Sequence, residues 1–583
     1  MTEIVFDIET DGLNPTRIWC VVAQVVGAGE HVFLEHERAL FKQFLEEHKG
    51  ATLYAHNGIG FDYPVLSRLW GIIPVDGTTV WRDTYVLSSL SNPSRLGGHS
   101  LGNWGDYLGF PKGGHEDWSQ YSEEMLTYCK RDVQVTCKVL ETLHKELEGF
   151  DEESINLEHS TAWIIKQQER NGWLLDMSYA MQLFAQMKER QNELEETVQR
   201  VFTPLPTFIK SIAPKIKKDG TMSIVGLKFL GDRWGEVAGD FSRIDWPVFN
   251  LGSRQQIARH LQYYGWKPTK LTAPTEKGGG GNIMVDEKVL EGVEGIPEAT
   301  LIREYLTMQK LSAMVGAWID HADQDTHRIH GRVRSNGAVT GRMTHSDPNL
   351  AQVPAKSEWG PKCRRCFIVE QGYKLVGTDA SGLELRMLAH YMDDDAYTKE
   401  VLDGDVHTAN QRAAGLDTRD LAKTFIYAFL YGAGDPKIGS IVGGSAKAGK
   451  ALKAKFLKNT PALESLRERV LDAAERGWLR GLDGRRIAVR SSHAALNTLL
   501  QGAGAVIMKR ALCILDEYAK LWSITYRFVG NIHDEIQAEV LEKDAKKFAY
   551  LAEASLVAAG QYYNLRCPLA GEAKIGLSWE ETH

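Results

Sequence analysis

The 583-residue sequence lacks several features that define special classes of protein. It has no stretch of 18 or more consecutive apolar residues, so we expect no transmembrane helix. Its first residues contain no basic region followed by an apolar stretch, so we expect no secretory signal. Cysteine is scarce, with seven in the whole chain, which is typical of a reducing compartment. We therefore expect a cytoplasmic protein, with a length that suggests roughly three to five domains.

The sequence also lacks a full set of zinc ligands and an excess of positive charge. Cys363 and Cys366 form one Cys-x-x-Cys pair, but no second pair exists, so we expect no structural zinc. The formal net charge of −8 argues against nucleic-acid binding over the whole surface. Basic residues nevertheless cluster locally, at 447–458, 215–218 and 485–490. Such a chain can hold both a basic channel and carboxylates that bind metal ions.

Acidic residues punctuate apolar segments near the start of the chain. Asp7 and Glu9 lie two residues apart in a strand predicted at 4–9, so their side chains project from one face. Asp62 ends a turn-rich stretch that follows a second apolar strand. Each motif alone is more typical of a solvated strand end or a polar turn.

A fourth carboxylate and a phenol follow in a helical pattern predicted at 122–147. Tyr128 and Asp132 are four residues apart and therefore share a helix face. The oxygen-rich set of four acids and one tyrosine suits Mg²⁺ or Mn²⁺. Two such ions can activate a water and stabilise the leaving oxygen of a phosphodiester.

The middle of the chain is dominated by long helical patterns that flank a different segment. Residues 200–250 are rich in proline and glycine with interspersed basic residues, which predicts an irregular insertion. Paired helices with a basic loop can form a clamp over a duplex or a structural spacer. The residues of this region alone favour the spacer.

The C-terminal half contains a second set of acids. Asp379 follows a strand predicted at 374–378 and precedes a helix predicted at 381–390. Asp534 and Glu535 follow His533 at the turn of a predicted hairpin. An isolated His-Asp-Glu is usually only a polar turn, but Asp379 beside Asp534 would form a second two-metal site.

A helix predicted at 418–432 carries a mixed stripe of side chains. Every fourth residue is a cation or an aromatic, in the order Arg419, Lys423, Tyr427 and Tyr431. Arginine and lysine bind phosphate, and a tyrosine ring offers a stacking face. The stripe therefore fits a nucleoside triphosphate, although an amphipathic surface helix would show a similar pattern.

Together these motifs resemble two known families. The N-terminal acids and tyrosine resemble, in order and type, the 3′–5′ exonuclease (proofreading) domain of the DnaQ-like family. Segment 379–386, the Arg/Lys/Tyr/Tyr helix and residues 533–535 resemble motifs A, B and C of family A (Pol I-type) DNA polymerases. Segments 340–350 and 497–502 are similar to that family too. The amino-acid sequences of these motifs are similar to those of the replicative polymerases of T-seven-like podophages in particular.

The resemblance implies two Mg²⁺ ions at each of two active sites, for which Mn²⁺ can substitute. At the polymerase site, Glu535 would support the ions from beside them, and at the exonuclease site Tyr128 would orient the attacking water. The residues implied to hold the ions are Asp379, Ala380 and Asp534 at the first site and Asp7, Glu9, Asp62 and Asp132 at the second.

The resemblance also implies contacts with the nucleotide and with DNA. Glu384 would exclude a ribose hydroxyl, and the Tyr427 hydroxyl would replace the interaction that a dideoxynucleotide lacks. The implied nucleotide-binding residues are Arg419, Lys423, His407, Tyr427, Tyr431 and Glu384. Arg342, Asn497, Gln501 and His533 are the implied DNA-binding residues, and the first three would probe the minor groove, where every correct pair presents an acceptor.

The implied architecture is α/β and multidomain. An RNase H-like 3′–5′ exonuclease domain is expected at 1–150, followed by a right-hand polymerase domain. Within that domain the expected parts are a thumb at 151–330, a palm at 331–405 and 485–583, and fingers at 406–484. No segment precedes Asp7 that could hold a 5′ nuclease, so that activity is not expected.

The expected function is replicative, template-directed DNA synthesis with proofreading. A repair or exonuclease-dominant family A polymerase and a relative of the single-subunit RNA polymerases remain alternatives, and a non-catalytic nucleic-acid-binding protein is a third. Expected partners are primer-template DNA, dNTPs and, in a phage-infected bacterial cytoplasm, a helicase-primase and a single-stranded DNA-binding protein. The insertion near 200–248 is shorter than the thioredoxin-binding insertion of podophage relatives, so dependence on host thioredoxin is not expected.

Overall fold

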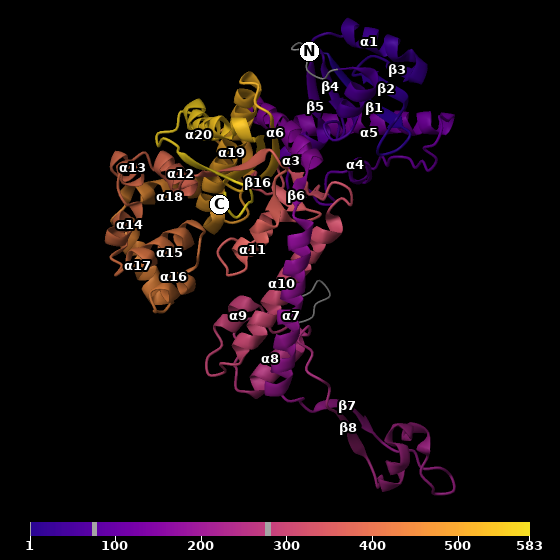
Figure 1. Cartoon of the computed structure of the whole chain (residues 1–583), viewed down its shortest axis with the longest axis vertical. Helices are drawn as coiled ribbons and strands as arrows, with labels where there is room; N and C mark the ends of the chain where they lie inside the picture. The colour runs from indigo at the N-terminus through magenta and orange to yellow at the C-terminus, as the bar shows by residue number, and fades with distance from the viewer. Residues whose placement is uncertain (1, 73–78, 274–280) are drawn as a thin grey trace. The chain divides into compact units, whose positions relative to one another are not determined.

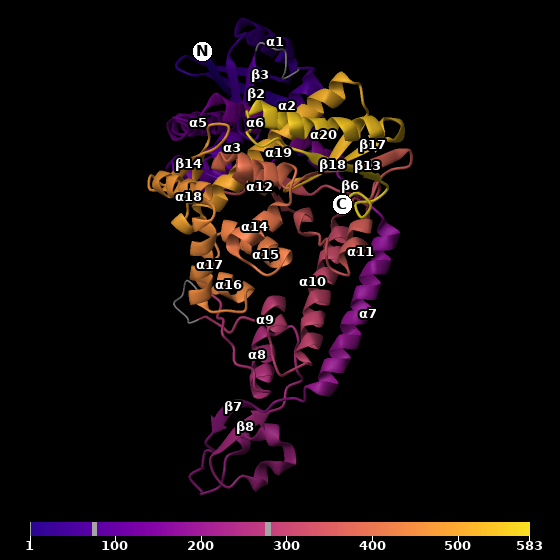
Figure 2. The same cartoon turned by 90° about the vertical axis from the view of Figure 1, so that its left-hand side faces the viewer.

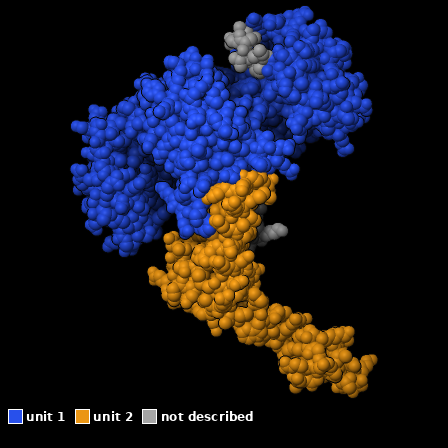
Figure 3. Space-filling view, in the orientation of Figure 1, with its two compact units in different colours: residues 1–176, 321–583 blue, residues 177–320 orange. Residues whose placement is uncertain are grey.

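A computed structural model describes residues 2–72, 79–273 and 281–583 (Figure 1). The chain divides into two compact units (Figure 3). Unit 1 combines Met1–Asp176 with His321–His583, and unit 2 is Met177–Asp320. Segment 151–176 of the predicted thumb thus belongs to unit 1, because α6 (Glu152–Asn171) packs against elements from the C-terminal half of the chain.

The first part of unit 1 is built around a five-stranded mixed sheet of order β3-β2-β1-β4-β5. The central strand β1 pairs antiparallel with β2 and parallel with β4. Its bounds, Glu3–Thr10, confirm the strand predicted at 4–9, and those of α5, Glu123–Glu146, confirm the helix predicted at 122–147. The other elements are β2 (Ile18–Val25), β3 (Glu30–Leu34), α1 (Arg38–Glu47), β4 (Thr52–Ala55), α2 (Asp62–Val65), β5 (Val80–Asp83), α3 (Thr84–Ser91) and α4 (Leu101–Tyr107).

The two-residue period of β1 divides its side chains between two cores. Ile4, Phe6 and Ile8 enter one core with α1, whereas Val5 packs into the other with residues of α5. Asp7 and Glu9 follow Val5 at intervals of two and therefore share its face. The alternation of the strand thus directs both acids toward α5.

The second part of unit 1 contains a four-stranded antiparallel sheet of order β16-β17-β13-β18. Its strands are β13 (Tyr373–Ala380), β16 (Tyr526–Ile532), β17 (Glu535–Leu541) and β18 (Gly571–Gly576). The hairpin predicted around 533–535 is confirmed. Strand β13 includes Asp379, beyond the end predicted at Thr378, because it pairs on both sides up to that point.

One helix covers this sheet, and a second helix packs against the first. Helix α20 (Ala545–Tyr562) packs against β13 and β18 and against α19 (Ala495–Leu521), as Figure 2 shows. Segment Ser492–Leu521 has the length and composition of a membrane-crossing helix, but 83% of its most apolar window is buried inside the protein. Its apolar character is therefore that of a core helix.

Shorter strands and helices complete the β-rich part of unit 1. One small sheet has the order β12-β6-β9, and two ribbons pair β10 with β11 and β14 with β15. Their bounds are β6 (Trp173–Leu175), β9 (Arg328–Ile329), β10 (Arg332–Arg334), β11 (Thr344–Ser346), α11 (Gly360–Arg365), β12 (Phe367–Ile368), β14 (Trp478–Arg480) and β15 (Arg486–Ala488).

A group of helices lies between β13 and β14 in the chain. Helix α15, which is the one predicted at 418–432, spans Arg419–Leu430 with Thr418 as its N-cap. Phe425 and Phe429 are buried against Phe456 of α17, which anchors the helix to its neighbours. The remaining bounds are α12 (Leu383–Met392), α13 (Asp395–Leu402), α14 (Val406–Ala414), α16 (Asp435–Ile441), α17 (Ala446–Lys458) and α18 (Pro461–Ala474).

Unit 2 consists of two long helices and a β-hairpin segment. Helices α7 (Met177–Val201) and α10 (Ala299–His321) contact each other through Arg190 and Glu304, whose side chains lie 2.8 Å apart. The segment predicted to be irregular near 200–248 contains an antiparallel pair, β7 (Thr207–Ile212) and β8 (Phe241–Asp245). The short helices α8 (Arg254–Tyr263) and α9 (Glu287–Glu291) lie between the hairpin and α10 in the chain.

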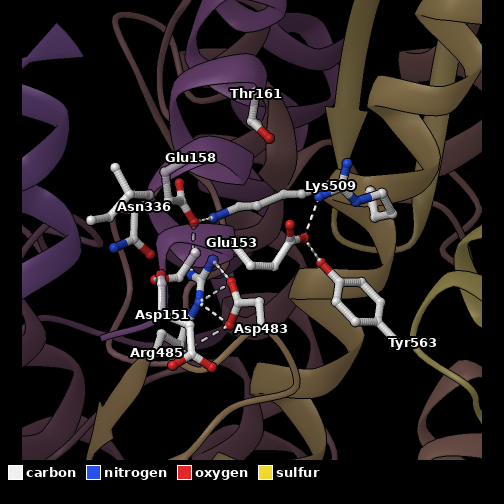
Figure 4. A network of polar contacts seen from close by, with 12 residues as sticks. Asp151, Glu153, Glu158, Thr161, Asn336, Asp483, Arg485, Lys509 and Tyr563 are labelled. Carbon is white, nitrogen blue, oxygen red and sulfur yellow. Dashed lines mark hydrogen bonds and ion pairs between the residues drawn. The ribbon is translucent and has the colours of Figure 1, made fainter. Parts of the chain in front are cut away.

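A network of buried charges connects three segments of unit 1 (Figure 4). Glu158 of α6 accepts a hydrogen bond from Lys509 of α19 and forms an ion pair with Arg485, which follows β14. Arg485 also forms a bidentate pair with Asp483, whose side chain is buried as well. Two acids and two cations thus neutralise one another away from water, as buried charges require.

Candidate active sites

The first carboxylate cluster lies in a cleft of about 1190 Å³ in unit 1. The cleft is lined by all five residues predicted in the N-terminal region, Asp7, Glu9, Asp62, Tyr128 and Asp132. Strand β1 presents the first two, α2 begins at the third, and α5 presents the last two. The structure therefore brings together side chains that lie up to 125 residues apart in the sequence.

Burial makes these carboxylates difficult to ionise together. Burial, followed by repulsion from Glu9 and the other acids, raises the pKa of Asp7 well above its usual value. Burial also raises the pKa of Glu9 to about 9 and that of Asp62 to about 7. Four buried acids that repel one another have a strong tendency to take up protons or to bind cations.

Several oxygens of the cluster have no hydrogen-bond partner among the described residues. They are buried atoms of three acids, Glu9 Oε1, Asp62 Oδ1 and Asp132 Oδ1. Uncompensated buried oxygens are costly, and carboxylate oxygens are the ligands that Mg²⁺ and Mn²⁺ prefer. The donor set therefore fits divalent cations.

A cysteine also borders the cluster. A ligand atom of each of Asp7, Glu9 and Cys129 lies within 4.8 Å of the others. Burial raises the pKa of the Cys129 thiol well above its usual value, so the sulfur stays protonated. Cys129 is consequently a weak donor, 3.6 Å from the Asp7 carbonyl, rather than an anionic ligand.

Lys112 is a member of the cluster that the sequence patterns do not reveal. Its Nζ donates to Asp132 Oδ2 at 2.7 Å and lies 4.8 Å from the centre of the Tyr128 ring. Hydrogen bonds to these two residues raise the pKa of Lys112 against the opposing effect of burial. It therefore supplies a permanent positive charge beside the carboxylates.

Asp83 is a second member that the motifs do not reveal. This buried residue ends β5 and accepts from the backbone N–H groups of Asn57 and Ile59, at 2.9 and 3.0 Å. It thereby holds the turn that leads into Asp62. The available signal was an acid at the end of an apolar strand, directly before a helix that it caps.

The second cluster lies where β13 meets the β16–β17 hairpin. Asp379 is directly opposite Glu535 in the antiparallel register, and Ala380 N donates to the Asp534 carbonyl at 3.0 Å. Burial, followed by repulsion from Asp534 and Glu535, raises the pKa of Asp379 to about 6. His533 takes a positive φ of 58° at the turn. The structure thus places the predicted acids together.

Glu535 is buried and held by several donors. Trp579 Nε1 lies 2.6 Å from Oε1, Gln537 Nε2 also donates to Oε1, and His583 Nδ1 is 3.1 Å from Oε2. Burial would raise the pKa of Glu535, but hydrogen bonds from His583 and Gln537 and the charge of Arg364 lower it overall. Its oxygens are therefore ionised and occupied, which suits a supporting position. None of these partners was predicted.

Helix α15 presents its stripe toward the residues after β13. Tyr431, which is the C-cap of α15 and lies beyond its last turn, donates through Oη to Glu384 Oε2 at 2.7 Å. Glu384 in turn lies 3.2 Å from Arg342. The rings of Tyr427 and Tyr431 are 6.2 Å apart, so three predicted nucleotide-site residues and one predicted DNA-binding residue meet here.

The cationic end of the stripe also has neighbours. Arg419 pairs with Asp405 at 2.6 Å, and the His407 ring lies 6.1 Å from that of Tyr427. Lys423 is exposed on the same helix. Asn497 and Gln501 lie four residues apart, half-buried, in the first turns of α19. All predicted polymerase-site residues are therefore in unit 1.

Comparison with known proteins identifies the class to which this architecture belongs. The family model for DNA polymerase family A matches residues 230–581 of the sequence. The chain belongs to this family. It is 34% identical to the DNA-directed DNA polymerases of Enterobacteria phage T3 and Escherichia phage T7, over the full length of each chain. It is 29% identical to the thermostable DNA polymerase I of Thermus aquaticus, over 59% of this chain and 44% of that protein.

A solved structure shares the fold. The POL domain of Pol1 from M. smegmatis, in complex with DNA primer-template and dNTP, superposes with a TM-score of 0.76. The two chains are 19% identical, and the match covers 100% of this chain and 96% of the other. The α/β architecture with a family A polymerase fold is thereby confirmed.

Proposed function

We propose that this protein is a template-directed replicative DNA polymerase that adds deoxynucleotides to a primer 3′ end and removes mispaired ends by 3′–5′ excision. The observation that carries the proposal is the presence of two separate carboxylate clusters in a chain of family A. One cluster lies at the turn of the β16–β17 hairpin in the sheet of the polymerase fold. The other lies in a cleft beside a different sheet. Each has the oxygen donors for divalent cations.

At the proposed polymerase site, Asp379 and Asp534 would hold Mg²⁺. When bound, the ions would lower the pKa of the primer 3′-hydroxyl and neutralise the charge of the departing pyrophosphate. Glu535 keeps its negative charge beside these acids through its contacts with His583 and Gln537. Arg419 and Lys423, four residues apart on α15, would bind the triphosphate.

The residues around Glu384 would select the sugar and the base pair. Glu384 is fixed between Arg342 and Tyr431, so its carboxylate cannot swing away freely. A fixed, charged group beside the sugar would reject a ribose hydroxyl, which supports deoxynucleotides as the substrate. Asn497 and Gln501, in the first turns of α19, would act as donors toward the minor groove.

At the proposed exonuclease site, Asp7, Glu9, Asp62 and Asp132 would hold the ions. Their unpaired oxygens support this assignment. Burial raises the pKa of the Tyr128 hydroxyl, so it remains protonated and can orient a water by hydrogen bonding. Lys112 neutralises part of the charge of Asp132 and fixes its position.

Paired variants test the assignment of two activities to two sites. The double variant Asp7→Ala/Glu9→Ala should lose excision of a 3′-labelled primer and retain primer extension. Asp534→Ala should lose extension and retain excision, and EDTA should abolish both. The two-site proposal is wrong if Asp7→Ala/Glu9→Ala removes both activities while the protein remains folded. A comparison of dNTP with rNTP incorporation by the wild type tests the choice of sugar.

A further inference from the structure

The lining of the first cluster's cleft includes residues other than the carboxylate set. Its lining includes His330 and residues 332–335 and 344–347, from the segment around the β10–β11 ribbon. In the sequence this ribbon lies next to Arg342 and far from the N-terminal sheet. Both segments nevertheless belong to unit 1. Residues outside the predicted exonuclease domain therefore help to form the cleft.

The ribbon presents two cations and two hydroxyl groups in register. Arg332 is opposite Ser346, and Arg334 is opposite Thr344. Because side chains alternate along a strand, the two arginines share one face, whereas the intervening Val333 is buried. All five residues line the cleft. Guanidinium and hydroxyl groups are the usual protein partners of phosphate oxygens.

The side chains of both arginines are exposed. Within the described ranges, the side chains of Arg332 and Arg334 make no hydrogen bond or ion pair, and only their backbones pair in the ribbon. Arg328, at the base of the same segment, contrasts with them because it is buried and paired with Glu370 and Glu539. The charge of Arg328 is neutralised by these two acids, whereas the charges of Arg332 and Arg334 remain available to a ligand.

The ribbon is held in place by α6. Glu169 Oε1 accepts from Val333 N at 2.6 Å, and the Glu169 carbonyl lies 2.9 Å from His330 Nδ1. Lys166 pairs with the same Glu169 carboxylate at 2.7 Å. The arginines therefore extend from a fixed backbone, and a ligand would bind without the cost of ordering a loop.

The lining of the same cleft also includes aromatic rings and the carboxylates. Trp118 and Tyr128 both line the cleft, with ring centres 5.7 Å apart. Aromatic faces together with backbone-binding cations are the combination that proteins use for single-stranded nucleic acid. At about 1190 Å³ the cleft exceeds the ~300–1,000 Å³ of small-ligand pockets and suits a short polymer.

We propose that Arg332 and Arg334 bind the phosphates of the single-stranded 3′ end of the primer while its terminal nucleotide lies at the carboxylates. The proposal rests on the excision function proposed above and names the residues that position its substrate. The ribbon is a positioning element because its arginines act on the backbone and not on the reacting phosphate. It gives the polymerase part of the chain a direct share in excision.

The double variant Arg332→Ala/Arg334→Ala tests the proposal in the full-length protein. Excision of a single-stranded oligonucleotide should show a KM about tenfold higher or more, with kcat nearly unchanged, because charged hydrogen bonds to phosphate are lost. Single-nucleotide incorporation on a primed duplex should be unaffected. Arg38→Ala/Lys49→Ala removes the same charge from exposed positions that do not line the cleft, and should leave both activities unchanged.

A binding measurement provides a readout that does not depend on catalysis. Anisotropy of a labelled single-stranded oligonucleotide is followed in EDTA, with and without the two arginine substitutions in the Asp7→Ala/Glu9→Ala background. Loss of two phosphate contacts should lower the slope of log K against log salt by about 1.4. Arg332→Lys/Arg334→Lys should restore most of the slope, because the charges return.

The outcomes separate this inference from the proposed function. If KM and the salt slope match those of Arg38→Ala/Lys49→Ala, the ribbon does not bind the strand and the inference is overturned. An equal loss of duplex incorporation would also overturn it, since the ribbon would then hold the duplex. Persistent excision by Asp7→Ala/Glu9→Ala would instead refute the assignment of the exonuclease site itself.

Discussion

Single residues in the two clusters solve the same electrostatic problem in different ways. At the second cluster, Glu535 is kept ionised by hydrogen bonds from neutral donors and His583 and by the more distant charge of Arg364. At the first, where four acids are buried together, one cation, Lys112, is placed against Asp132. This difference predicts that the two sites respond differently when a single neighbour is removed.

Lys112→Met should change how the first site responds to Mg²⁺. Removal of one positive charge a few ångströms away makes the cluster more attractive to a divalent cation, so half-saturation of excision should need about tenfold less Mg²⁺. The maximal excision rate should fall, because Asp132 and Tyr128 lose a partner that positions them. Lys112→Arg is the control. An unchanged Mg²⁺ requirement in Lys112→Met would contradict this role.

Tyr427→Phe tests the hydroxyl of the nucleotide-binding stripe. Burial raises the pKa of Tyr427, so its hydroxyl stays protonated and can donate. If it replaces the interaction that a dideoxynucleotide lacks, incorporation of dideoxynucleotides relative to dNTPs should fall about tenfold or more in Tyr427→Phe. The ratio is measured by competitive primer extension, with Tyr391→Phe as a control outside the stripe. An unchanged ratio would refute this function of the hydroxyl.

The residue patterns allowed the acids to be predicted but not all their partners. Asp7 with Glu9 and Tyr128 with Asp132 follow from strand and helix periods, which are local properties. Lys112 comes from a segment without regular structure, and His583 lies 48 residues from Glu535. No local period connects such residues to their sites.

At the scale of elements, α6 and α19 are joined by buried charge in addition to apolar packing. Glu158, Lys509, Arg485 and Asp483 form a neutral set in which each charge has a partner. Burial lowers the pKa of Lys509 to about 8, while Glu158 acts in the opposite direction. At neutral pH the lysine therefore still carries its charge.

The charge balance of this network predicts the effect of two variants. Lys509→Met should destabilise the fold by about 3–5 kcal/mol, because it leaves a net negative charge buried with Glu158. Lys509→Met/Glu158→Gln should recover much of this loss, because Arg485 and Asp483 remain paired. Thermal and denaturant unfolding measure both. Equal destabilisation by the single and double variants would show that packing, and not charge balance, determines the effect.

At the scale of the whole molecule, this chain is shorter than its alignment with a relative, and we predict that the difference includes the segment near 200–248. Its alignment with the phage T3 polymerase spans 713 positions, 130 more than this chain has residues, so the relative contains material that is absent here. The hairpin segment nevertheless exposes large apolar side chains, among them Phe208, Val225, Trp246 and Val248. Such a surface is unusual for a segment without a ligand.

Replacement of residues 207–245 by a short Gly/Ser linker should separate chemistry from processivity. Because the segment belongs to unit 2 and all predicted active-site residues belong to unit 1, single-nucleotide incorporation should be unchanged. Products on a long primed template with excess unlabelled DNA as a trap should become several-fold shorter. Loss of single-nucleotide incorporation in a folded variant would contradict this division.

Thioredoxin provides a separate test on the wild-type protein. The short insertion predicts that added host thioredoxin does not lengthen the products in the same trap assay. A marked increase in product length would show that the shorter segment still binds thioredoxin. The phage T7 polymerase, which is 34% identical over its full length, is assayed in parallel as a comparison for the effect of thioredoxin on product length.

The sequence by itself determined which residues could act together on a single element. Its periods paired Asp7 with Glu9 and aligned Arg419 with Lys423 and Tyr427, because the geometry of strands and helices is local. Only the tertiary structure decided which elements meet. It placed Lys112 against Asp132, connected Glu158 to Lys509, and brought the Arg332–Arg334 ribbon into the lining of the cleft that contains Asp7. Those contacts depend on long-range packing of buried faces, which local spacing does not encode.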